Sequence, residues 1–138
     1  MRGFLLDTNV LSELSKTKPS DRVEAFLARR EEFWLSVVSL HEVAFGLARM
    51  ADVKRRGRLE AWFGSIKESF ADRIIPVDEG IAETAGRVRG ALASTGRVIG
   101  PLDSIIGATA VVRALTLATR NMRDFEYLNV ALVNPWEA

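Results

Sequence analysis

Four acidic residues stand at positions where an α/β fold gathers its functional groups. Asp7 ends an apolar run, Asp124 follows another, and Glu42 and Asp103 each lie in the first turn of a predicted helix. In an open parallel sheet, ligands bind at the edge formed by the carboxyl ends of the strands. We therefore expect these four carboxylates to converge at one edge of a sheet.

Converging carboxylates need protons or a cation between them, because two like charges about 4 Å apart repel by about 4 kcal/mol at an effective dielectric of 20. The chain has no cysteine and one histidine, His41, which excludes thiolate zinc sites and mechanisms that need two imidazoles. A ligand set made of oxygens favours Mg²⁺, with Mn²⁺ as the alternative. Such an ion assists phosphodiester hydrolysis. We expect His41 to flank a helix start rather than to transfer protons.

Taken singly, each acid also has a structural interpretation as a helix cap, a dipole partner or a turn residue. Ser39 and Glu42, for example, have the spacing of a capping box. A non-catalytic protein-interaction module therefore stays open, and so does a receiver-like α/β module that uses the acids as a phosphorylation site. A receiver would need a lysine late in the chain, and the last lysine is Lys67.

The elements that must position these acids alternate along the chain. Apolar runs predict strands at 3–6, 33–36, 74–77 and 116–119, with a fifth at 131–133. Helical spacing predicts helices at 8–14, 21–30, 39–50, 59–70, 79–94 and 102–114, the fourth after a basic connection at 54–58. Alternating strands and helices predict one α/β domain over residues 1–138, with a short central parallel sheet of about 4–5 strands and helices on both faces.

The charge balance also points to a polyanion. Nineteen basic and 18 acidic residues give a net charge of +1, so gathering the acids in a metal site would leave a basic surface. Fifteen of the 19 basic residues are arginines, which suit bidentate contacts to phosphate. Arg120 and Arg123 are the candidates for contacts to phosphate, because they lie close in sequence to the proposed site. No apolar run reaches the roughly 18 residues of a membrane span, so we expect a soluble, cytoplasmic protein.

Several segments together resemble the PIN-domain ribonucleases, and more narrowly the VapC-type toxins of type II toxin–antitoxin systems, in the FitB-like or plasmid-stability branch. The segments are Leu5–Glu13, Ser39–Glu42, Asp103–Ala110 and Ala118–Phe125, and the ending Val133–Trp136 is similar to that branch as well. The resemblance therefore spans nearly the whole chain. Each segment alone is a weak signal, and the combination is specific.

The resemblance implies that Asp7, Glu42 and Asp103 form the acidic core of a catalytic metal site and that Asp124 supplies the fourth acid. Many relatives carry aspartate where this chain has Asn121, which can offer only a neutral oxygen. Asp124 would then ligate through water or orient a ligand. Supporting positions are expected for Thr8, Asn9, Ser39 and Thr119.

The resemblance also implies the activity and the partners. It predicts an endoribonuclease toxin that depends on Mg²⁺ or Mn²⁺ and hydrolyses phosphodiester bonds in RNA such as tRNA or rRNA. It further predicts neutralisation by a small VapB-like antitoxin, a homodimer, and contact with operator DNA only through the antitoxin.

Overall fold

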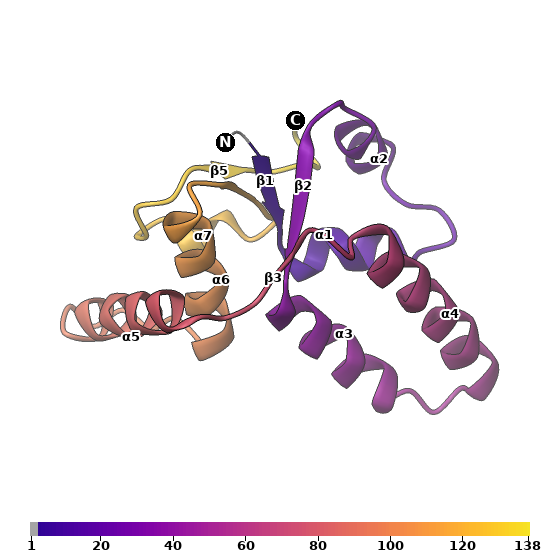
Figure 1. The fold of residues 1–138 in the computed structure, drawn as a ribbon, viewed down its shortest axis with the longest axis horizontal. Coiled ribbons are helices and arrows are strands. Elements are labelled where there is room, and N and C mark those ends of the chain that lie inside the picture. The colour runs from indigo at the N-terminus through magenta and orange to yellow at the C-terminus, as the bar shows by residue number, and fades with distance from the viewer. Residues whose placement is uncertain (1–2) are drawn as a thin grey trace.

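Five parallel strands form one sheet, in the order β3-β2-β1-β4-β5, in a computed structural model that describes residues 3–138 (Figure 1). The strands are β1 (Gly3–Leu6), β2 (Glu32–Ser36), β3 (Ile74–Ile75), β4 (Thr116–Ala118) and β5 (Leu132–Val133). The first strand lies in the middle, paired with β2 on one side and β4 on the other. The residue that follows β1 therefore emerges at the centre of the sheet edge.

Helices cover the two faces of this sheet in separate groups. On one side lie α1 (Thr8–Glu13), α2 (Asp21–Leu27), α3 (Val37–Ala48) and α4 (Val53–Ser69), and on the other α5 (Glu79–Ala93), α6 (Pro101–Val112) and α7 (Met122–Phe125) (Figure 1). Within the described residues no helix is both long and apolar enough to cross a membrane. This arrangement confirms the predicted α/β class, with a parallel sheet and helices on both faces.

Each face of the sheet has its own apolar core. Successive side chains of a strand point to opposite faces, so Leu5 packs with Ile81 and Ile106 while its neighbour Leu6 packs with Val10. Leu5 and Leu6 are both fully buried. Because β1 is covered on both faces, its run of consecutive apolar residues holds the backbone at Asp7 in a fixed place.

The third helix begins earlier than the sequence predicts. It starts at Val37, and Ser36 is its cap, with Ser36 Oγ accepting a hydrogen bond from Val38 N at 3.0 Å. The expected start at Ser39, and with it the capping box to Glu42, is therefore wrong. Ser39 is buried inside the first turn, and Glu42 lies in the second turn.

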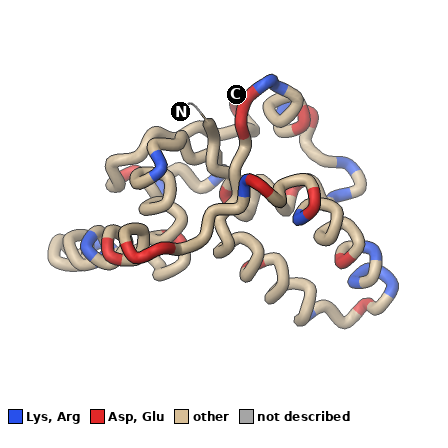
Figure 2. The backbone as a smooth tube through the Cα atoms, in the orientation of Figure 1, with Lys and Arg blue, Asp and Glu red and all other residues tan. Residues whose placement is uncertain are grey.

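The basic run 54–58 is part of α4, which corrects its expected role as a connection before the helix. Asp52 caps this helix by accepting a hydrogen bond from Arg55 N at 3.1 Å. Basic residues are concentrated in the first turns of the helix (Figure 2). The predicted apolar side of this helix is confirmed, since Leu59 and Phe63 are buried against the core.

One helix has no counterpart in the sequence prediction. The short α7 follows β4 and carries Asp124 in its first turn. At four residues it is too short for apolar spacing to reveal it.

Candidate active site

Hydrogen bonds hold both the backbone and the side chain of Asp7. Its backbone N continues the β1–β4 pairing by donating to Ala118 O at 2.9 Å. Its side chain caps α1, because Oδ1 accepts from Thr8 N at 2.8 Å, while Oδ2 accepts from Thr119 Oγ1 at 2.8 Å. Only 5% of Asp7 is exposed. Both carboxylate oxygens are thus oriented before any ligand binds.

The protein environment disfavours the charged form of this carboxylate. Burial raises the pKa of Asp7 from 3.8 to about 6, against the hydrogen bonds from Thr119 and Thr8, which lower it. The negative charges of Asp103 and Glu42 raise this pKa further. The pKa of Asp103 is also raised, first by burial and then by the charges of Asp124 and Glu42. Acids from four segments therefore act on one another.

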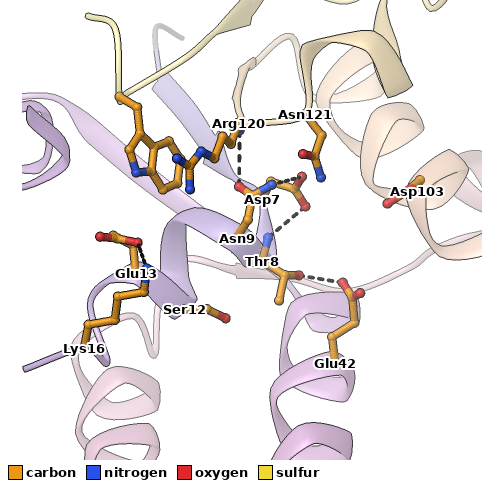
Figure 3. Close-up of a pocket in the computed structure, with 11 residues that line it drawn as sticks. Asp7, Thr8, Asn9, Ser12, Glu13, Lys16, Glu42, Asp103, Arg120 and Asn121 are labelled. Atoms are coloured by element: carbon orange, nitrogen blue, oxygen red, sulfur yellow. Dashed lines mark hydrogen bonds and ion pairs between the residues drawn. The ribbon is translucent and has the colours of Figure 1, made fainter. Parts of the chain in front are cut away.

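A cavity of roughly 440 Å³ opens beside Asp7 at the carboxyl edge of the sheet. Glu42 enters from α3 and Asp103 from the first turn of α6, so that three carboxylates from separate elements face one space (Figure 3). The predicted residues that line it are Asp7, Thr8, Asn9, Glu42, Asp103, Arg120 and Asn121. The structure therefore brings most of the predicted site together.

Glu42 is oriented by a hydroxyl from the neighbouring helix. Thr8 Oγ1 donates to Glu42 Oε1 at 2.5 Å and lies 2.9 Å from Ser39 Oγ. A hydroxyl has one proton to donate, so when Thr8 donates to Glu42, Ser39 is the donor to Thr8. The expected supporting positions of Thr8 and Ser39 correspond to this chain of contacts, which joins α1 to α3.

Two predicted residues lie apart from the cavity. Asp124 and Arg123 are exposed on α7 and do not line it, although the charge of Asp124 reaches Asp103. Asn121, between them and β4, does line the cavity. The neutral amide of Asn121 therefore lines the cavity, whereas the carboxylate of Asp124 does not.

Four further residues line the cavity that the sequence reasoning did not place in the site: Ser12, Glu13, Lys16 and Trp136. The first three follow Asn9 at helical spacing, a signal that was available. The negative charge of Glu13 is paired with Lys16, because Lys16 Nζ lies 2.8 Å from Glu13 Oε1. This contact lowers the pKa of Glu13. Nothing in the sequence around Trp136 indicated a place in the site. The pairing of β5 with β4 is what brings Trp136 to the cavity.

The donor set fits a hard divalent ion. Asp7, Glu42 and Asp103 offer carboxylate oxygens, and no basic side chain in residues 3–138 lies within ion-pair distance of any of them. Across the same residues, no three acidic, histidine or cysteine side chains are packed closely enough to form a ready-made metal site. Because Mg²⁺ usually keeps several waters, separated carboxylates around a cavity suit it better than a tight cage would.

Comparisons of the sequence with known proteins agree along the whole chain. A model of the PIN domain matches residues 4–130. The chain is 37% identical to the VapC ribonuclease Y4jK of Sinorhizobium fredii, over 97% of this chain and 98% of that protein. It is 38% identical to Toxin FitB of Neisseria gonorrhoeae, over 96% and 98%. It is 31% identical to a tRNA(fMet)-specific endonuclease VapC of Shigella flexneri, over 99% of each.

Solved structures show the same fold. The crystal structure of FitAcB from Neisseria gonorrhoeae matches with a TM-score of 0.89 at 36% identity, covering 98% of this chain and 99% of that one. VapBC-5 of Mycobacterium tuberculosis, described as a member of the VapBC family of toxin–antitoxin systems, matches with a TM-score of 0.70 at 30% identity, covering 96% and 98%. The matches therefore cover nearly the whole of the fold.

Proposed function

The chain belongs to the PIN-domain family, and from this premise we propose that it is an endoribonuclease toxin that uses a divalent metal ion and is neutralised by a cognate antitoxin. Relatives at 31–38% identity are named as ribonuclease, toxin and endonuclease. Because the relative from Shigella flexneri is named as specific for tRNA(fMet), tRNA is the substrate class that we propose. Ribosomal RNA is the second candidate.

One observation carries the proposal: Asp7, Glu42 and Asp103 face a single cavity and, within the described chain, have no basic partner. Clustered carboxylates that are left unpaired are costly in a folded protein. A structural role such as helix capping would not require them to share one space. Their common environment instead favours a cation site that serves a reaction.

Asp7, Glu42 and Asp103 would hold Mg²⁺ or Mn²⁺, with Asn121 as a neutral oxygen donor and Asp124 acting through water. A bound divalent ion supplies Lewis-acid polarisation of a phosphoryl oxygen and a water of lowered pKa. These assignments explain why the fold tolerates a buried carboxylate whose pKa is raised to about 6.

The remaining residues orient these ligands and the RNA. Thr119 and the N–H of Thr8 fix the two oxygens of Asp7, and the hydroxyl of Thr8 fixes Glu42. Arg120, which is exposed and lines the cavity, would bind an RNA phosphate there, and the exposed Arg123 would bind another.

The antitoxin would bind an apolar groove between α3 and α4. Ala44, Leu47, Ala48 and Phe63 line this groove of roughly 350 Å³, and Arg56 and Glu60 edge it. An apolar groove between two helices is a common docking place for an amphipathic helix. VapBC-5 of Mycobacterium tuberculosis, described as a member of a family of toxin–antitoxin systems, supports an antitoxin as the partner.

Incubation of the purified protein with a tRNA pool and with ribosomal RNA, in MgCl₂, in MnCl₂ and in EDTA, tests the proposal. We expect cleavage with either ion and none in EDTA. Asp7→Asn and Asp103→Asn should each abolish it while the protein stays folded by circular dichroism. The matched control is Asp72→Asn, because the Asp72 side chain is 85% exposed and away from the cavity.

Three results would overturn the proposal. Cleavage that persists in both Asp7→Asn and Asp103→Asn would contradict the site assignment. Cleavage unaffected by EDTA would contradict the metal. If the wild-type protein binds its partners but cuts no RNA with either ion, the chain is a non-catalytic interaction module.

A further inference from the structure

Arg120 is exposed, and yet both its backbone and its guanidinium make defined contacts. Its backbone N donates to Asn9 Oδ1 at 3.3 Å, and the carbon of its guanidinium lies 4.8 Å from the centre of the Trp136 ring. Asn9, Arg120 and Trp136 all line the cavity with the three carboxylates. An arginine that is only a solubilising surface group would need neither contact.

The backbone contact ties Arg120 to the acidic centre. Asn9 Nδ2 lies 3.4 Å from Asp7 Oδ2 and 3.4 Å from Thr119 Oγ1, and Thr119 Oγ1 also accepts from Asn121 N at 3.0 Å. Residues 119–121 are therefore fixed relative to the Asp7 carboxylate. The position from which Arg120 extends is set by the same hydrogen bonds that orient the catalytic acid.

The aromatic ring is held independently of Arg120. Val133 O accepts from Thr119 N at 2.9 Å, which pins β5 to the end of β4, and Asn134 Oδ1 accepts from Trp136 N at 2.9 Å. The ring is partly buried and packs against the core shared by α1–α4. The Trp136 ring therefore keeps its position without help from Arg120, and the guanidinium packs against it.

The guanidinium of Arg120 forms no ion pair within residues 3–138. Over residues 3–138, no carboxylate lies within 4.0 Å of it, although it is near enough to Glu13 to lower the pKa of that acid. A guanidinium stacked on an aromatic face keeps its edge N–H groups free for bidentate contact with phosphate. The ring also reduces the rotamer freedom that phosphate binding would otherwise remove.

We propose that Trp136 is a positioning residue: its ring holds the Arg120 guanidinium at the cavity as the anchor for the RNA phosphate next to the one that is cut. This assignment rests on the proposed nuclease function, because it places the anchored phosphate next to the one that is cut. RNA binding by Arg120 can nevertheless be measured without cleavage. Arg120 touches the substrate, and Trp136 acts only through Arg120.

The test measures binding of a short fluorescein-labelled oligouridylate by anisotropy, over a series of KCl concentrations at fixed MgCl₂, in the Asp103→Asn background so that the RNA stays intact. Arg120→Gln should weaken binding about 10- to 100-fold, as expected for loss of one charged hydrogen-bonding group. It should also reduce the slope of log K against log salt by about 0.7, the value for one phosphate contact on a single strand.

If Trp136 positions Arg120, then Trp136→Leu lowers both the affinity and the salt slope as Arg120→Gln does. The double variant should be no weaker than Arg120→Gln alone. Trp136→Phe, which keeps an aromatic face, should retain most of the affinity and the wild-type slope. A wild-type slope in Trp136→Leu, or effects that add in the double variant, would overturn the proposal and leave Trp136 as a packing residue.

A second stacked pair provides the matched control. The Arg97 guanidinium lies 4.0 Å from the centre of the Tyr127 ring, and neither residue lines the cavity. Arg97→Gln and Tyr127→Leu should leave RNA affinity and salt slope unchanged, and a change equal to that of Arg120→Gln would overturn the assigned anchor. Wild-type protein that binds RNA as described but cuts none would contradict the nuclease proposal while leaving the anchor in place.

Discussion

The hydroxyl of Thr119 donates a 2.8 Å hydrogen bond to Oδ2 of Asp7 across the β1–β4 junction. Both residues are buried, at 0% and 5% exposure, and each follows directly after its strand. Parallel pairing of β1 with β4 places Leu6 opposite Ala118, so the next residue of each strand meets the other at the edge of the sheet. The carboxylate of Asp7 is therefore oriented by strand register.

Replacing this hydroxyl tests how much the orientation contributes. Thr119→Val removes the shorter of the two hydrogen bonds to Asp7 Oδ2 and leaves the 3.4 Å contact from Asn9 Nδ2. This loss should reduce the free energy of unfolding by about 1–2 kcal/mol. Metal affinity should fall about 10- to 100-fold, as is common when a partner that orients a ligand is lost. Urea unfolding and calorimetric titration with MnCl₂ measure the two effects.

Thr109→Val is the matched control, because Thr109 is equally buried but its hydroxyl donates to Ile105 O within α6. It should leave metal affinity unchanged. Equal losses of metal affinity in the two variants would show that Thr119 has no special relation to the site.

The raised pKa of Asp7 predicts how the stability of the metal-free protein depends on pH. The folded state holds the Asp7 proton up to about pH 6, whereas the group has an ordinary pKa of 3.8. Between these values the folded state binds more protons than the unfolded state, so the free energy of unfolding falls as pH rises. The loss from this group is up to about 3 kcal/mol, and Asp103 contributes in the same direction.

Asp7→Asn removes one of these titrating groups and should flatten that dependence. Urea unfolding in EDTA at several pH values between 4 and 7 measures it, with Asp72→Asn as the control that retains the wild-type profile. An unchanged profile in Asp7→Asn would mean that folding does not raise the pKa of Asp7.

Position 121 tests the balance between repulsion and metal binding. Asn121→Asp adds a fourth carboxylate to the residues that line the cavity. The added like charge should destabilise the metal-free protein by about 1 kcal/mol and strengthen binding of Mn²⁺ by about tenfold. Thermal unfolding in EDTA and calorimetric titration with MnCl₂ check both signs. Weaker metal binding in this variant would show that the Asn121 side chain is not among the ligands.

The groove between α3 and α4 can be blocked without touching the acids. Ala48 is exposed and lines this groove, so Ala48→Glu would place a charge on its apolar floor. We expect at least a tenfold loss of affinity for the cognate antitoxin, because an unpaired charge must be desolvated on binding. RNA cleavage should remain at the wild-type rate.

Ala71→Glu, at an exposed position outside the groove, controls for the added charge. Antitoxin affinity is measured by calorimetry with the purified partner. If Ala48→Glu binds as the wild type does, the antitoxin docks elsewhere.

Residues that depend on local pattern were predictable from sequence. The apolar run before Asp7 indicated a strand, and Pro101 indicated the start of the helix that carries Asp103. The α3 start was wrong because Ser36 and Ser39 are both acceptable caps, and only tertiary packing selects between them. The basic run 54–58 was misplaced because a charged helical turn has no apolar face to reveal it.

Residues that depend on distant contacts were not predictable. Nothing local to Trp136 indicates that it reaches the cavity, because its position follows from the pairing of β5 with β4. Likewise Asp124 and Asn121 are close in sequence, and the turn of α7 decides that only Asn121 lines the cavity.

The walls of the cavity come from both extremes of the described chain, with Asp7 beside β1 and Trp136 beyond β5. During translation the amino-terminal strand leaves the ribosome long before the tryptophan is made. A nascent or prematurely terminated chain that stops short of residue 136 therefore lacks part of the pocket. The three carboxylates and Arg120 are thus made before the aromatic ring against which Arg120 packs.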